Sequence, residues 1–188
     1  MKAHNIDQLN QDFKQNAKTK HKIVGIQTWH LNLNPLAMSQ LAFSKGGKIT
    51  DMDLGYHVDW RGPFATQAGA LMVEITTNKG LKGYGLGVCF FCFVVIIDQH
   101  LQYFLIDQDP LDVVQIWDHL YHISSIYGRR GLVIYALSGI ALALWDLCGK
   151  ILDQPVYALI TDQPRSEIPA YAAGNDSVDY VAQGFSAC

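Results

Sequence analysis

The feature that most constrains this chain is a long apolar helical pattern in its second half. The fifteen residues from Gly131 to Trp145 carry no charge, and the helical pattern spans Leu132–Ile151. A membrane-spanning helix needs roughly 18 or more apolar residues in a row, so this run indicates a buried helix and no membrane segment. Because a helix that is apolar on most faces must be covered on most faces, we expect it at the centre of a globular domain.

Strand patterns precede this helix. Lys22–Leu31 is rich in β-branched and aromatic residues and predicts a first strand. Ala70–Thr77 and Leu81–Val88 flank the turn sequence Asn78-Lys79-Gly80, which predicts an antiparallel hairpin. Residues 32–68 contain four glycines and two prolines and predict a long irregular segment. Loops of this length in compact domains are usually functional or disordered.

Helical patterns follow the hairpin, and the order of elements indicates the fold class. Phe93–Leu105 predicts one helix, and a second should open with Asp109 as N-cap and Pro110 at its first position. After the long apolar helix, Glu167–Ala173 predicts a buried strand and residues 177–184 a helix that ends at Gly184. The pattern is an α+β domain, with antiparallel strands followed by a helical bundle, and then the first strand and helix of a parallel α/β array.

Composition excludes several classes of function. The 188 residues are 49% hydrophobic and 16% charged, which is typical of a globular protein. A formal charge of −3 and a pI of about 6.1 provide no basic surface for nucleic acid or an anionic membrane. The four cysteines do not have the spacing of a disulfide framework, and no signal peptide precedes them. We therefore expect a protein of the reducing cytoplasm.

Two short motifs invite functional interpretations that their context does not favour. Gly83-Tyr84-Gly85-Leu86-Gly87 lacks the spacing of a nucleotide-binding loop, so we interpret its glycines as places where another backbone approaches the strand. Cys89 and Cys92 have the spacing of a zinc or redox site, but no second pair of ligands accompanies them. Two buried small hydrophobic residues are the favoured interpretation.

Charged motifs on the helical half leave two alternatives open. Asp118, His119 and His122 could hold a metal, or Asp118 and His122 could form an ion pair on a solvated helix face, which is favoured. The turn Tyr127-Gly128-Arg129-Arg130-Gly131 could bind a carboxylate or phosphate through its arginines, or could simply solvate the end of a helix.

The long segment offers a further set of candidate binding residues. Tyr56-His57-Val58-Asp59-Trp60-Arg61 places imidazole, carboxylate, indole and guanidinium groups on one glycine-rich loop. Such a set suits substrate recognition, and a loop folded on its own aromatic residue explains it equally well. Ser138 lies inside an apolar helix, away from any strand–helix elbow, and no pair of carboxylates has a spacing that suggests acid–base catalysis.

A family resemblance narrows these alternatives. The stretch from Arg129 to Lys150, followed by Gln154–Tyr157, resembles the last capping-domain helix of the mandelate racemase/muconate-lactonizing branch of the enolase superfamily, where S-G/A-I-D-x-A-L-W-D-L-x-G-K and P-V/L-Y recur. Met72–Gly85 is similar to the hairpin of that domain, and Ile168–Gly174 to the first strand of its barrel. The resemblance covers roughly residues 22 to 188, and the L-rhamnonate dehydratase family is the nearest likeness within the branch.

This resemblance implies a division of the chain. Residues 1–21 would be a polar, frayed N-terminal extension, residues 22–165 the capping domain, and residues 166–188 the start of a truncated (β/α)₈ barrel. Such a barrel needs about 250 residues, so most of it would lie outside this sequence.

The resemblance also implies a chemistry. The parent would be an Mg²⁺-dependent acid-sugar dehydratase, which removes the proton next to a carboxylate and then expels water to give a 2-keto-3-deoxy acid. His57 and Arg61 would contact the sugar acid, whereas the base and the metal ligands would lie on the barrel. We expect an inactive isolated chain and a homo-oligomeric parent. A racemase or cycloisomerase of the same branch, or a non-catalytic relic or interaction module, remain the alternatives.

Overall fold

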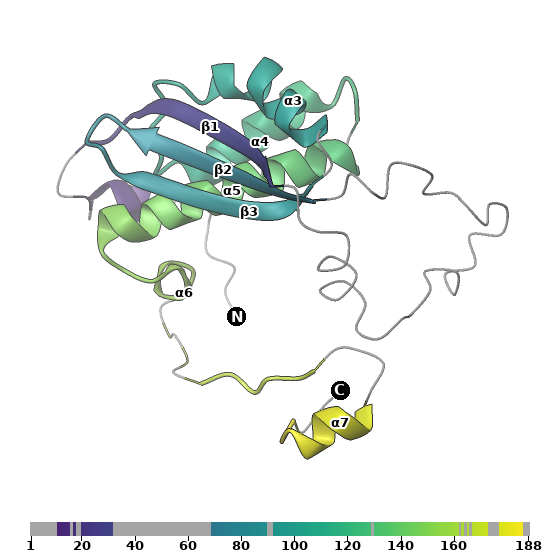
Figure 1. Cartoon of the computed structure of the whole chain (residues 1–188). Coiled ribbons are helices and arrows are strands. Elements are labelled where there is room, and N and C mark those ends of the chain that lie inside the picture. The colour runs from purple at the N-terminus through teal and green to yellow at the C-terminus, as the bar shows by residue number, and fades with distance from the viewer. Residues whose placement is uncertain are drawn as a thin grey trace, which may run out of the picture.

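The computed structural model describes residues 11–15, 17, 20–31, 69–89, 92–128, 130–161, 163, 165, 167–172 and 177–185. A short helical turn at residues 11–15 precedes three strands, and helices follow them (Figure 1). The elements are β1 (Ile23–Leu31), β2 (Gly69–Thr77), β3 (Lys82–Cys89), α3 (Cys92–Gln99), the 3₁₀ helix η3 (Leu101–Phe104), α4 (Val113–Ser124), α5 (Leu132–Leu152), α6 (Val156–Leu159) and α7 (Ser177–Ala182). The predicted α+β capping architecture is confirmed for the strands and the helices that follow them.

The strands form one antiparallel sheet in the order β1-β2-β3. Thr76 lies opposite Lys82 and Gly69 opposite Cys89, so β2 and β3 make the predicted hairpin, with Gly80 at a φ of 80° in its turn. Leu71, Val73 and Ile75 alternate along β2 and are fully buried on one face. That alternation fixes the register, since a slip of one residue would move all three to the opposite face.

Helix α5 packs against the buried face of the sheet, chiefly on β3 and β2. A Cβ atom at Gly85 would lie 2.0 Å from the carbonyl oxygen of Gly139, and one at Gly83 would lie 2.2 Å from that of Ala143. Only glycine permits so close an approach of strand and helix backbones. The interpretation of the glycine-rich motif as a backbone contact is confirmed.

The core lies between this sheet and the helices that cover it. Leu137, Ile140, Leu144 and Leu147 of α5 are at most 1% exposed. Burying one side chain of this size stabilises the fold by roughly 1.5–3 kcal/mol. Within the described part of the chain, α5 alone is long and apolar enough to cross a membrane, and half of its most apolar window is buried inside the fold. That burial is typical of the core helix of a globular domain.

The N-terminal region is more ordered than its polar composition predicts. Residues 11–15 form a helical turn, and the Phe13 ring is 5% exposed. It contacts Trp145 of α5 edge-to-face, with ring centroids 6.1 Å apart, and Lys14 Nζ lies 2.7 Å from Asp112 Oδ1. The prediction of a frayed extension is therefore wrong for this segment, because one aromatic side chain anchors it in the core.

Two helix boundaries differ from the sequence-based expectation. The helix predicted over Phe93–Leu105 is divided into α3 and η3, because the backbone at His100 leaves the helical region, with a φ of −136° and a ψ of −63°. The next helix begins at Val113 with Asp112 as its N-cap. Asp109 instead accepts the Leu111 N–H at 3.0 Å, which makes a turn before the helix.

The C-terminal part matches the prediction only in its helix. Helix α7 forms and is followed by Gly184 at a φ of 94°, as expected. Residues 167–172 form no strand, and Ile168 and Tyr171 are 77% and 72% exposed. The predicted buried strand is therefore wrong for these residues, since a strand needs hydrogen-bonded neighbours and no described residue pairs with them. The start of a barrel stays a prediction.

Candidate functional site

The two predicted substrate contacts, His57 and Arg61, lie outside the described residues, so they stay predictions. The structure does define where their segment is attached. Leu31 at the end of β1 lies opposite Ala70 at the start of β2, so residues 32–68 leave and re-enter the sheet at one end. We call this the loop end; the Asn78–Gly80 turn lies at the opposite end of the hairpin.

Polar side chains of β1 and α3 meet near the loop end. Thr28 Oγ1 donates to Asp98 Oδ1 at 2.7 Å, which ties the strand to the helix. His30 follows on the same face, since His30 pairs with Leu71 and Thr28 with Val73, both of which point into the core. His30 Nε2 is buried and has no hydrogen-bond partner in the described part of the molecule. His30 is thus the described imidazole at the strand end from which the predicted binding segment departs.

The sequence did not lead us to predict His30 as a site residue, although the strand pattern contained a signal for it. The alternation of Ile26, Thr28 and His30 in the first strand places a histidine at its last core-facing position. A buried imidazole can donate or accept a hydrogen bond, depending on its tautomer. A lone strand histidine is more often a satisfied core residue than a ligand-binding one, and only the buried, unpaired nitrogen distinguishes this one.

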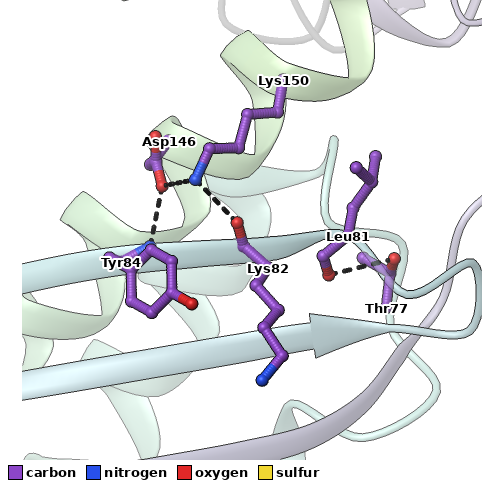
Figure 2. A network of polar contacts seen from close by, with 6 residues as sticks. All are labelled: Thr77, Leu81, Lys82, Tyr84, Asp146 and Lys150. Carbon is purple, nitrogen blue, oxygen red and sulfur yellow. Dashed lines mark hydrogen bonds and ion pairs between the residues drawn. The ribbon is translucent and has the colours of Figure 1, made fainter.

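The charged residues of the motif that carries the resemblance contact β3. Asp146 Oδ2 accepts the Tyr84 backbone N–H at 2.8 Å, and Lys150 Nζ lies 2.5 Å from the same oxygen (Figure 2). Lys150 Nζ also donates to the Lys82 carbonyl at 2.7 Å. These two side chains act on the backbone of a strand, so their contacts explain the W-D-L-x-G-K pattern as a structural one.

A second charged pair lies on the sheet face opposite α5. Lys82 Nζ lies 2.8 Å from Glu74 Oε1, and Glu74 is only 7% exposed. The hydrogen bond from Lys82 is the largest of the effects that lower the pKa of Glu74, and it outweighs the opposing effect of burial. Glu74 is therefore ionised at neutral pH and unsuited to act as a general acid.

His122 and Asp118 lie side by side on the exposed face of α4, a geometry that makes the predicted ion pair when His122 is protonated. His122 Nδ1 lies 3.4 Å from Asp118 Oδ2, with both side chains mostly exposed, and the His119 ring contacts Phe104 edge-on. Among the described residues no three of His, Cys, Asp or Glu are grouped closely enough to hold a metal ion. The described part of the chain therefore does not provide a ligand set that fits Mg²⁺.

The cysteines and the arginine turn add no chemistry to the loop end. Cys92 and Cys148 are free thiols, and Cys148 is buried with its S–H directed at the Pro110 carbonyl, 3.4 Å away. Burial raises the pKa of the Cys148 thiol well above its usual range, which makes it unreactive. Arg130 is exposed at the turn before α5, whereas Arg129 lies outside the described residues. Binding of an anion by this turn stays a prediction.

Comparison with known proteins identifies the family. Residues 61–161, more than half of the chain, match the mandelate racemase/muconate lactonizing enzyme N-terminal domain. The chain belongs to this family. The family match includes β2, β3 and α3 to α6, so the glycine contacts and the Asp146–Lys150 pair lie inside the family domain.

Individual members of the family agree with this assignment. Over 104 residues the chain is 39% identical to an L-rhamnonate dehydratase of Saccharopolyspora erythraea, a match that covers 55% of this chain and 27% of that protein. The structure is similar to that of a rhamnonate dehydratase from Gibberella zeae complexed with Mg, with a TM-score of 0.73 and 29% identity over 91% of this chain and 44% of that one. The chain thus spans less than half the length of these relatives.

Proposed function

We propose that this chain is the capping part of an acid-sugar dehydratase of the L-rhamnonate dehydratase type. The observation that carries the proposal is the 39% identity to such a dehydratase over the family domain. In this proposal the sheet and α5 form a rigid support, and the segment 32–68 contacts the sugar acid. The base and the Mg²⁺ ligands are supplied by a barrel, so the 188-residue chain alone has no dehydratase activity.

The residue types on the proposed binding segment fit an acid sugar. The Arg61 guanidinium can form two parallel hydrogen bonds to a carboxylate. The His57 imidazole can bond to a hydroxyl as donor or acceptor. Both residues belong to the segment between β1 and β2, and β2 pairs with β3, which the Gly83 and Gly85 contacts hold against α5. A rigid support is what precise positioning of a substrate requires.

A chimera tests this proposal. Residues 22–165 of this chain would replace the equivalent part of the S. erythraea dehydratase, and dehydration of L-rhamnonate and related sugar acids would be measured with and without EDTA. We expect EDTA-sensitive activity in the chimera and none in the 188-residue chain. Turnover by the chain alone would refute a purely capping role.

Variants of the chimera test the two contacts. We expect His57→Ala and Arg61→Ala each to lower kcat/KM by about tenfold or more, the equivalent of about 1.4 kcal/mol of transition-state binding. Lys79→Ala is the matched control, because Lys79 is exposed in the turn at the other end of the hairpin. An active chimera whose kcat/KM is unaffected by either substitution would remove His57 and Arg61 from the site.

A further inference from the structure

Strand β3 is an edge strand of the sheet. In the order β1-β2-β3, the described part of the chain gives it a partner strand on one side only. The backbone groups on its other side include the Tyr84 N–H and the Lys82 carbonyl, which α5 side chains bind. An unpaired row of such groups is a template for another strand, and folded proteins usually block it.

Helix α5 supplies such a block through two residues one turn apart. Asp146 occupies the Tyr84 N–H and Lys150 occupies the Lys82 carbonyl, while Asp146 and Lys150 also contact each other (Figure 2). The Lys150 ammonium lies 4.9 Å from the centre of the Tyr84 ring. The close approach of α5 at Gly83 and Gly85 brings these short-range contacts within reach. The pair thus saturates two successive edge groups with side-chain partners.

We propose that the Asp146–Lys150 pair is an edge block that prevents a second copy of this chain from adding its own β3 to the sheet. A second copy is the partner that fits, because an antiparallel β3–β3 pairing is two-fold symmetric and needs no other complementary surface. The side chains that would meet across it are Tyr84 and Leu86, which are 44% and 58% exposed. Apolar and aromatic cross-strand pairs of this kind stabilise antiparallel pairing.

The 188-residue chain itself provides the test. Asp146→Ala with Lys150→Met removes both contacts, and association is followed by sedimentation velocity across a hundredfold range of concentration. We expect the double variant to associate at a concentration at least tenfold below the wild type. At the lowest concentration its Tyr84 amide should exchange with deuterium at least tenfold faster. Wild-type association together with unchanged Tyr84 exchange would overturn the proposal.

Two further variants separate edge pairing from general loss of stability. Adding Leu86→Lys to the double variant places a charge on the free edge and should return association to the wild-type level. Association that persists with Leu86→Lys would assign it to another surface and reject the edge block. Ile140→Val, which weakens the core and leaves Asp146 and Lys150 in place, should leave association unchanged. If the double variant does not fold, Lys150→Met alone still frees the Lys82 carbonyl and should give the same effect in weaker form.

Discussion

The two faces of α5 are built from the same kinds of residues and have opposite surroundings. A Cβ atom at Gly139 would contact the Leu71 and Val73 side chains of β2, and Leu137 and Leu144 are fully buried. By contrast, Leu132, Tyr135 and Leu142 are 44–49% exposed. The comparison shows that the apolar run predicts the helix, whereas the close contacts of Gly83 and Gly85 determine which face of the helix the sheet covers. Substitutions on the two sides can test this difference directly.

The largest effect on the free energy of unfolding is expected where the backbones of β3 and α5 are in contact. Gly85→Ala would place a methyl group 2.0 Å from the Gly139 carbonyl oxygen, so strand and helix would have to separate. We expect a loss of about 4 kcal/mol or more in the free energy of unfolding, measured by urea denaturation. Gly87→Ala is the control in the same strand, because a Cβ there meets nothing within 4 Å. Equal effects of both substitutions would contradict the close-packed geometry.

A core leucine and an outward leucine of α5 provide the next comparison. Leu144→Ala removes a fully buried side chain and should cost about 3 kcal/mol, by lost burial and by the cavity it leaves. Leu142→Ala removes a side chain that is 48% exposed and should cost less than about 1 kcal/mol. Thermal and urea unfolding of the two variants would measure the difference. Similar losses would mean that the outward face is covered in solution.

The contact of Phe13 with Trp145 of α5 gives the next prediction. Phe13→Ala should lower the free energy of unfolding by about 2 kcal/mol, since the ring is buried and contacts Trp145 edge-to-face. Tryptophan fluorescence of the native state should change as well, because Trp145 loses that neighbour. A deletion of residues 1–10 that retains Phe13 is the control. An unchanged stability of Phe13→Ala would restore the interpretation of this segment as a frayed extension.

The hairpin and α5 show what local sequence patterns can predict. Both are specified within a few residues, by turn chemistry and by continuous apolarity, and both were predicted to within one or two residues. Phe13 behaves differently, because its burial depends on a contact with the distant Trp145. The strand expected over Glu167–Ala173 needs partners that the described residues do not supply.

The candidate site was less predictable than the fold. His57 and Arg61 came from the family resemblance, and they remain predictions because their segment lies outside the described residues. His30 was missed because its position is that of an ordinary strand residue, and only the tertiary structure reveals the buried, unpaired nitrogen. The charges of the helix motif bind backbone groups of β3, which no spacing within the motif could indicate.

The contribution of Glu74, on the sheet face opposite α5, to the free energy of unfolding should be smaller than that of Phe13 and should depend on pH. Because the pKa of Glu74 is lowered in the folded protein, its contribution is present above the unfolded-state pKa and is lost as pH falls through the folded-state pKa. Glu74→Gln should therefore cost about 1 kcal/mol at most near pH 7, and the difference from the wild type should shrink as the pH is lowered. Urea midpoints measured at a series of pH values would show this convergence. A constant difference would place the effect of Glu74 in packing instead of charge.

The smallest effect is expected on the outward face of α5. Leu142→Lys puts a long charged side chain at a half-exposed position, where its ammonium can reach solvent while its methylenes keep the contacts of the leucine. Stability should change by less than about 0.5 kcal/mol. Self-association of the Leu142→Lys variant should also be measured. If copies of the chain pack together through this face, the interface would bury the introduced charge and association would weaken. A weaker self-association of Leu142→Lys at unchanged stability would assign the outward face of α5 to an assembly contact, whereas unchanged association would leave it to solvent.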